Sequence, residues 1–285
     1  MSKVDLHIHS TASDGRFSPA DIARKSAAEG LTVIALADHD TIDGIVPALE
    51  TARAFPWLTV IPCVEISTDV PNGEAHVLGY FINYADHGLQ TTLERMHNSR
   101  RERARGMVAK LRNLGLNIEW ERVQKIAGSG ALGRPHVAQA MLEKGYIDSL
   151  KEAFTKYIGR DGPGYVEREK MTPVEAVALI LQNNGLPVLA HPLTIPDPET
   201  MVIELKAAGL VGIEAYYESY TIGEISRLVS LADRYGLITT GGSDYHGLDT
   251  STETTIRSVD VPIESVEQLE ALAEQRGLKL AIRQG

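Results

Sequence analysis

Two histidines lie one residue apart in DLHIHSTASDG, the stretch at residues 5–15. Alternate residues of an extended chain point to the same side, so His7 and His9 can direct both imidazoles at one metal ion. Asp14 follows in the adjoining loop. The same spacing returns near the other end of the chain, where Asp244 and His246 occur in GGSDYHG. The two short motifs predict a metal site assembled from distant parts of the sequence.

Further histidines and carboxylates lie at the ends of other apolar stretches of the chain, with His76 at the beginning of its stretch. They are His39 in ADHDT, Glu65 in CVEIS, His76 in AHVLGY and His191 in PVLAH. The complete candidate ligand set is His7, His9, Asp14, His39, Glu65, His76, His191, Asp244 and His246. In a closed α/β barrel the carboxyl ends of the strands meet on one face, where active sites form. We therefore expect all nine side chains to line one metal-binding pocket.

The ligand types restrict the metal and the chemistry. Imidazole and carboxylate without thiolate suit Zn, Mn or Fe. Nine ligands are too many for one tetrahedral ion, and three divalent ions become plausible if a carboxylate such as Glu65 bridges two of them. Such ions would outweigh the charge of Asp14, Glu65 and Asp244, our candidate catalytic residues, and would attract phosphate. Paired metal ions promote in-line displacement, so the set predicts hydrolysis of a phosphate ester.

Apolar runs and helical patterns alternate along most of the chain. Strands are expected at residues 3–6, 32–38, 58–67, 76–82, 186–191, 211–217 and 237–244. Helices separate many of them, and the first begins with Ser18 as N-cap, followed by Pro19, and ends at Gly30. This alternation predicts an α/β fold with a parallel sheet, either open or closed into a barrel.

The middle of the chain has a different pattern. Residues 97–165 contain no convincing strand, and four helical segments are expected there. We predict a helical insertion at 97–165 within a barrel domain formed by residues 1–96 and 166–285. The insertion begins with the basic run RRERARGMVAK, which fits either a solvated helix face or a positive flank beside an anionic substrate.

Composition narrows the possible partners and location. The chain has 285 residues and a formal net charge of -10, so a broad basic surface for duplex DNA is not expected. Cys63 is the single cysteine, so the chain cannot form an intramolecular disulfide, and this fits a reducing cytoplasm. We expect Cys63 to be a core residue. No signal peptide or membrane-spanning apolar run is evident, and we expect a cytoplasmic protein without a membrane partner.

The ordered motifs DLHIHSTASDG, ADHDT, VEIS, AHVLGY, AHP and GGSDYHG resemble those of the PHP (polymerase and histidinol phosphatase) family. The resemblance implies a distorted (β/α)7 TIM-like barrel, phosphoesterase activity and three divalent ions, with manganese favoured over iron or zinc. It assigns His7, His9, Glu65 and Asp244 to one ion, Glu65, His76 and His191 to a second, and Asp14, His39 and His246 to a third. Many members have histidine at the position of Asp14.

The stretch GRPHVAQAM at residues 133–141 resembles a motif of the PHP nucleotide phosphoesterases. The resemblance implies removal of the 3′-phosphate from nucleoside 3′,5′-bisphosphates and action on short 5′-phosphorylated RNA. Arg134 and His136 would then bind substrate phosphate. Arginine pairs with phosphate in a bidentate manner, and Pro135 places Arg134 just before a helix N-terminus. The alternative is a structural ion pair made by Arg134.

Three other functions are compatible with parts of the pattern. Histidinol-phosphate phosphatases belong to the same family, but the long insertion disfavours that activity. A non-catalytic metal-binding PHP module should lack several ligands, and none is missing here. An amidohydrolase would share the HxH motif, yet no strand-end lysine is present to bridge its metals. The sequence leaves base preference, the choice between mononucleotide and oligonucleotide, and the oligomeric state open.

Several polar residues near the motifs are expected to have supporting roles. Asp38 and Asp40 flank His39 and should point away from the metal ligands. His87 and His97 are expected at the surface. A tyrosine cluster follows one strand and is interpreted as packing, although it could stack a base; its members are Tyr216, Tyr217 and Tyr220.

Overall fold

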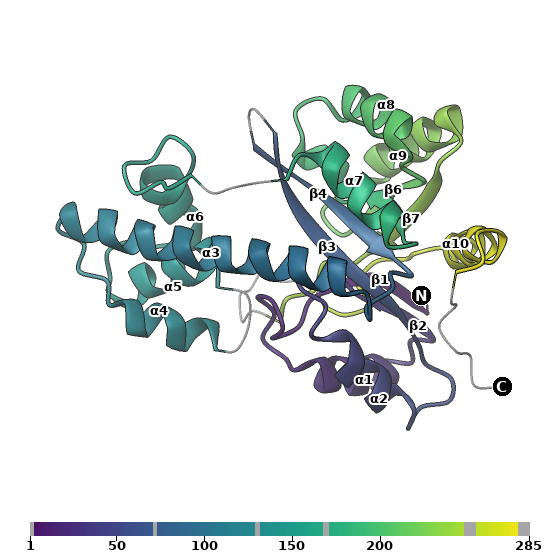
Figure 1. Ribbon diagram of the computed structural model, residues 1–285, viewed down its shortest axis with the longest axis horizontal. Helices are drawn as coiled ribbons and strands as arrows, with labels where there is room; N and C mark the ends of the chain where they lie inside the picture. The colour runs from purple at the N-terminus through teal and green to yellow at the C-terminus, as the bar shows by residue number, and fades with distance from the viewer. Residues whose placement is uncertain (1–2, 71–72, 129–131, 168–170, 248–254, 279–285) are drawn as a thin grey trace.

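The computed structural model describes residues 3–70, 73–128, 132–167, 171–247 and 255–278. Figure 1 shows a twisted sheet with helices around it and a group of helices at one side. The strands are β1 (Val4–Ile8), β2 (Val33–Leu36), β3 (Thr59–Val70), β4 (Gly73–Tyr80), β5 (Leu186–Leu189), β6 (Gly212–Tyr217) and β7 (Ile238–Gly242). The α-helices are α1 (Pro19–Ala28), α2 (Ile45–Ala52), α3 (His87–Asn113), α4 (Trp120–Ala127), α5 (Arg134–Glu143), α6 (Leu150–Ala153), α7 (Pro173–Gln182), α8 (Pro198–Ala208), α9 (Ile222–Tyr235) and α10 (Ile263–Gln275). A π-helical turn spans Phe154–Ile158 and a 3₁₀ turn spans Pro192–Thr194.

The seven strands follow one another in chain order across a single sheet. The first and last strands are brought together just beyond β7, where the amide of Asp244 donates to the carbonyl of His7 (2.9 Å) and the amide of His9 donates to the carbonyl of Tyr245 (2.9 Å). The buried carboxylate of Asp5 also accepts from the amide of Ser243 at 2.9 Å. The sheet therefore closes almost completely, as expected for a distorted TIM-like barrel.

The expectation of an all-parallel sheet is wrong at one strand, because β4 runs antiparallel to both β3 and β5. The long β3–β4 hairpin also places two candidate ligands inside strands instead of at their ends. Glu65 lies opposite Leu78, and Ser67 lies opposite His76. Since β4 runs in reverse, its amino-terminal half lies beside the carboxyl-terminal half of β3. His76 thus reaches the same face of the barrel as the ligands that follow parallel strands.

Side-chain caps fix where the main helices begin. Ser18 caps α1, and Thr172 and Thr221 form capping boxes with glutamates at the start of α7 and α9. The helix expected after Ser18 is thus confirmed. Within the described ranges, no helix combines the length and apolar character needed to span a bilayer.

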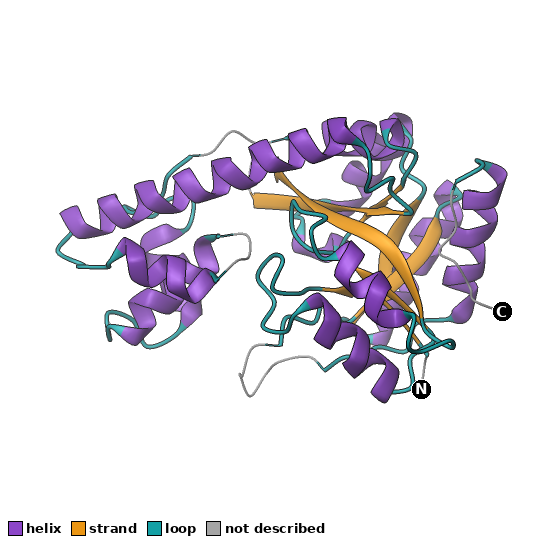
Figure 2. Cartoon of the chain, turned by 60° about the horizontal axis from the view of Figure 1, so that its bottom comes forward, coloured by secondary structure: helices purple, strands orange, loops and turns teal. Residues whose placement is uncertain are grey.

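The inserted helices have a hydrophobic cluster of their own. Its buried members run from Ala104 to Ile158 and include Met107, Leu111 and Val137. Figures 1 and 2 show this group beside the barrel, connected to it through the long helix α3. That helix begins at His87, ten residues before the expected boundary, so it extends from the barrel into the insertion. The division into two domains at residues 97 and 165 stays a prediction.

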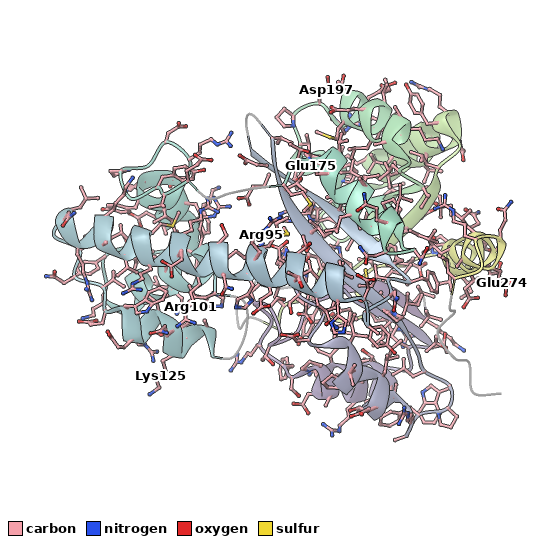
Figure 3. The ribbon with its side chains drawn as sticks, viewed as in Figure 1. Arg95, Arg101, Lys125, Glu175, Asp197 and Glu274 are labelled. Carbon is pink, nitrogen blue, oxygen red and sulfur yellow. The ribbon has the colours of Figure 1, made fainter. Side chains whose placement is uncertain are left out.

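The arginine run on α3 divides between two faces of the helix. Arg100 and Arg103, three residues apart, are largely buried, with side-chain exposures of 15% and 7%. Arg101, labelled in Figure 3, and Arg105 are exposed. Residues three apart share a helix face, so the run has one exposed face and one face turned toward the barrel, and the role of the second face beside a substrate stays a prediction. The inward face carries positive charge toward the barrel.

Gly242 provides a test of barrel closure, because a methyl group at this position would meet the backbone and Cβ of His7. We expect Gly242→Ala to destabilise the protein by about 1–3 kcal/mol through overpacking and to reduce metal content by displacing His7. Gly223→Ala in the first turn of α9 is the control, since the nearest atom to the new Cβ is 4.0 Å away. Urea unfolding and elemental analysis measure both effects. An unchanged unfolding midpoint for Gly242→Ala would contradict this account of closure.

Candidate metal centre

The structure brings the nine sequence-predicted ligands together on one face of the barrel. They come from every strand region except β6, and Glu65 is fully buried among them. Seven of them fall into three overlapping groups that could each hold an ion, whereas His191 and Asp244 contact members of these groups. These groups are His9, Asp14, His39 and His246; His7, His9 and Glu65; and His39, Glu65 and His76.

The β1 histidines face two carboxylates that come from distant strands. His7 Nε2 lies 3.3 Å from Glu65 Oε2 and 3.4 Å from Asp244 Oδ1. His9 Nε2 lies 3.3 Å and 3.0 Å from the same two oxygens. The alternate spacing of His7 and His9 thus does what the sequence predicts, since both imidazoles point into one small volume.

Glu65 connects these histidines to the others. Its Oε1 atom is 2.9 Å from His76 Nδ1 and 3.0 Å from His191 Nε2. Its Oε2 atom is also 3.0 Å from His39 Nδ1. Its two oxygens thus face different sets of imidazoles, as the predicted bridging role of Glu65 requires.

Asp14 lies among the histidines on the other side of the cluster. Its carboxylate lies 3.4 Å from His246 Nε2, 3.8 Å from His9 Nδ1 and 3.9 Å from His39 Nε2. His39 therefore lies within reach of both Asp14 and Glu65, and His9 within reach of both Asp14 and Asp244. These shared positions differ from the strict division into three ligand sets, so the assignment of each ligand to one ion stays a prediction.

Unsatisfied buried atoms indicate that the set fits metal ions. The atoms His7 Nε2, His9 Nε2, Asp14 Oδ1 and Glu65 Oε2 are buried and make no hydrogen bond. Buried polar atoms in folded proteins nearly always have a partner, and all four are atoms that ligate divalent cations. Clustered cations would satisfy all four at once.

The carboxylates are held in the ionised form that metal binding requires. Burial alone would raise the pKa of Glu65, but His39, His76 and His7 keep it well below its usual range. Burial opposes ionisation of Asp14 as well, yet His39 and His246 lower its pKa strongly. In turn, burial disfavours charge on His246, while Asp14 raises its pKa to about 10. Metal binding would replace protons on these imidazoles, since a ligating histidine is neutral.

Glu214 is a supporting residue that our sequence analysis did not identify. This fully buried residue of β6 contacts His7 Nδ1 at 3.0 Å through Oε1 and accepts from the amide of His191 at 2.8 Å through Oε2. A carboxylate on the far nitrogen fixes the ring and presents the other nitrogen to a metal. The sequence did contain a signal for this role, because Glu214 is an acidic residue inside the apolar run VGIEAYY.

The aspartates that flank His39 have the supporting roles we expected. Asp38 accepts hydrogen bonds from the Ser10 amide (2.7 Å) and from the hydroxyls of Ser10 (2.7 Å) and Ser13 (2.6 Å), which fixes the loop that carries Asp14. Asp40 accepts from the amide of Ser67 at 2.8 Å. Neither belongs to the metal-binding groups.

Two expectations about residues near the site need correction. The hydroxyl of Tyr217 donates to Asp244 Oδ2 at 2.8 Å, so this tyrosine orients a candidate ligand in addition to packing. His97 is half-buried, and burial lowers its pKa, whereas His87 is exposed as expected. Sequence spacing could not reveal the contact of Tyr217 or the burial of His97, because both depend on how distant elements pack.

The backbone is strained where several site residues follow their strands. Asp40, His191 and Asp244 have positive φ angles of 52°, 27° and 51°. Non-glycine residues rarely adopt such angles, and they are concentrated at functional sites in folded proteins. The strain directs His191 and Asp244 into the barrel mouth immediately after β5 and β7.

Arg134 and His136 begin α5 at the edge of this cluster. Arg134 Nη2 donates to Glu74 Oε2 at 2.5 Å, and its guanidinium lies 5.5 Å from the centre of the Phe154 ring. His136 is buried and its Nδ1 accepts from the Gly133 amide at 3.0 Å, which leaves Nε2 to carry the hydrogen. Burial lowers the pKa of His136, so this ring is a neutral donor.

The sequence of this chain matches a known protein family. The family described as PHP domain matches residues 5–166, more than half of the chain. The chain belongs to the PHP family. This confirms the family and the barrel fold that the motifs implied.

Relatives of this PHP protein span nearly its whole length. The 3′,5′-nucleoside bisphosphate phosphatase of Chromobacterium violaceum is 30% identical over 253 residues, which cover 86% of this chain and 88% of the relative. The 5′-3′ exoribonuclease Rnm of Escherichia coli is 31% identical over 247 residues, covering 85% and 84%. A solved structure of an amidohydrolase from C. violaceum, with bound sulfate and no metal, matches with a TM-score of 0.84 at 29% identity over 95% of this chain and 96% of that one.

The role of Glu214 can be tested by removing its charge. Glu214→Gln should weaken the hold on His7 and lower metal affinity by about 10–100-fold, because outer partners of metal ligands have effects of this size. Glu218→Gln changes an exposed glutamate just beyond the same strand and should leave metal content unchanged. Titration with a fluorescent metal indicator compares the two. Equal metal affinity in both variants would show that Glu214 does not position His7.

Proposed function

We propose that this PHP protein hydrolyses the 3′-phosphate of nucleoside 3′,5′-bisphosphates and also accepts short 5′-phosphorylated oligoribonucleotides. The observation that carries this proposal is the inward-facing arginine group of the insertion, which lies beside the metal-ligand cluster. Arg100 of α3 donates to the hydroxyl of Ser67, which in turn lies 3.3 Å from His39 Nδ1. A site that combines metal ligands and arginines suits a substrate with two separated phosphates.

The nine ligands would hold three divalent ions, and we favour manganese. Bound ions would activate water and stabilise the charge that develops on the phosphoryl oxygens. The complete ligand set argues against a non-catalytic module, because every candidate ligand reaches the cluster.

The chain's own residues would orient the substrate. His136 can donate from Nε2, and Arg134 offers a planar guanidinium, so together they can fix a phosphate at the start of α5. Tyr217 and Glu214 hold Asp244 and His7 in place. In the reaction, a water oxygen bonds to phosphorus as the bond between phosphorus and the 3′-oxygen breaks. The 3′-oxygen, which leaves, takes a proton. The products are phosphate and a 5′-nucleotide.

The activities of relatives support the choice of substrate. One relative is named as a 3′,5′-nucleoside bisphosphate phosphatase and another as a 5′-3′ exoribonuclease. Both activities need a site that recognises one phosphate and cleaves at another. The GRPH start of α5 provides such a recognition element outside the metal ligands.

The decisive experiment measures phosphate release from adenosine 3′,5′-bisphosphate by manganese-loaded protein. We expect 5′-AMP and phosphate as products, and loss of more than about 100-fold in kcat for Asp244→Asn, which removes a ligand charge. Asparagine tolerates the positive φ at this position, so the variant should fold normally. Hydrolysis of histidinol phosphate but not of the bisphosphate would overturn the proposed substrate, and full turnover by Asp244→Asn would overturn the site.

Arg134→Ala separates substrate binding from chemistry. Loss of a charge-assisted contact to phosphate should raise KM by about 10–100-fold, with a smaller change in kcat. Arg122→Ala is a control from the same insertion, since Arg122 forms an exposed pair with Glu143 away from the cluster. Steady-state kinetics with the bisphosphate distinguishes the two. Unchanged KM and kcat for Arg134→Ala would exclude the phosphate clamp.

A further inference from the structure

We propose that Glu74 acts as an internal competitor for substrate phosphate, holding the arginines of the insertion until a phosphate group displaces it. The inference rests on the proposed function for the identity of the substrate. It adds a residue that tunes affinity, and it assigns the arginine group to the phosphate that is not cleaved.

Glu74 lies where three arginines of the insertion converge. Its Oε2 atom accepts from Arg134 Nη2 at 2.5 Å, and its Oε1 atom lies 3.6 Å from Arg103 Nη1. Arg100 also acts electrostatically on this carboxylate. The two carboxylate oxygens thus face different guanidinium groups, as two oxygens of a bound phosphate would.

The surroundings hold Arg100 and Arg103 in place without Glu74, and Arg134 also lies over the ring of Phe154. Arg103 donates from Nε to the carbonyl of Val166 at 3.0 Å and lies over the ring of Tyr165. Arg100 is fixed through Asp40 and Ser67. Glu74 is the second residue of β4 and its side chain is 24% exposed, so its carboxylate can turn toward solvent. An incoming anion could therefore replace it while the arginine group stays assembled.

The position of Glu74 relative to the metal ligands matches a substrate with two phosphates. Glu74 and His76 are two residues apart on β4 and share one face of the strand, about 6.6 Å from each other along it. A ribose that carries phosphates at its 3′ and 5′ positions can span the two places. One phosphate would lie at the metal ligands, and the other would take the place of the Glu74 carboxylate.

This arrangement has a functional consequence. A ligand with one phosphate must displace Glu74 without compensation from contacts at the metal ligands, so the carboxylate weakens its binding. A bisphosphate makes both sets of contacts and offsets the cost of displacement. Glu74 would thus favour release of the 5′-nucleotide product and discriminate against abundant nucleoside monophosphates.

The test measures binding of 5′-AMP to the metal-free full-length protein by titration calorimetry. Glu74→Gln should tighten binding about tenfold, equivalent to about 1.4 kcal/mol. Adenosine, which lacks the phosphate, should bind both proteins equally. Asp69→Asn is the matched control, because Asp69 lies directly opposite Glu74 on β3 and pairs with Arg160 instead. Asp69→Asn should leave the affinity for 5′-AMP within about twofold of the wild type.

A double variant shows whether Glu74 acts through Arg134. The tightening caused by Glu74→Gln should disappear in the Arg134→Ala background, since no guanidinium remains there to be released. Weaker 5′-AMP binding by Glu74→Gln would mean that Glu74 holds Arg134 in its binding position, and this would overturn the proposal, as would unchanged binding. If Glu74→Gln does not fold, a crystal structure of the wild type with 5′-AMP decides, because Arg134 must have left Glu74.

These measurements do not depend on turnover. If the protein fails to hydrolyse the bisphosphate but Glu74→Gln still tightens 5′-AMP binding, the proposed substrate is wrong and the competitor stands. If the bisphosphate is hydrolysed and the affinity for 5′-AMP does not respond to Glu74, the competitor is wrong and the proposed function stands.

Discussion

Glu65 is a fully buried carboxylate whose oxygens lie within 3.3 Å of imidazole nitrogens from five histidines, which are His7, His9, His39, His76 and His191. Removing a carboxylate from water costs several kcal/mol unless charged or hydrogen-bonding partners replace the solvent. The five rings and the cations they can bind supply that compensation. The five histidines come from β1, β4 and the segments after β2 and β5. The Glu65 carboxylate is therefore compensated only when most of the barrel has assembled around it.

Barrel closure and the reversed strand both follow from this requirement. The hydrogen bonds between β1 and the segment after β7 bring Asp244 to within 3.4 Å of His7 and His9. The antiparallel β3–β4 hairpin places His76 next to Glu65, although the two residues are eleven apart in sequence. An entirely parallel arrangement would need a crossover connection between these strands, for which the chain between them is too short.

The sequence was sufficient to predict the parts of the site that depend on local spacing. The HxH motif points alternate side chains to one side, and this is a property of the extended backbone. Asp244 of the DxH motif instead has a positive φ of 51°, so its spacing predicted which residues meet but not the backbone that directs them. The reversed direction of β4 was not predicted, because the strands expected at 58–67 and 76–82 were too short and hid the tight connection that requires reversal. Glu214 and the contact of Tyr217 with Asp244 were missed for a related reason. Their roles depend on which strand lies beside β1 and β7, and this is a property of the closed sheet.

In the proposed function, the barrel and the insertion contribute two different kinds of side chain to substrate binding. The barrel supplies ligands that are buried and fixed by Glu214, Asp38 and Tyr217, whereas the insertion supplies arginines that already have carboxylate partners. Asp40 connects the two, since it accepts from the Ser67 amide on β3 and from Arg100 on α3. A change in the position of α3 would therefore reach His39 through Arg100 and Ser67. If the insertion binds phosphate as proposed, this chain of contacts would link phosphate recognition physically to the geometry of the metal ligands.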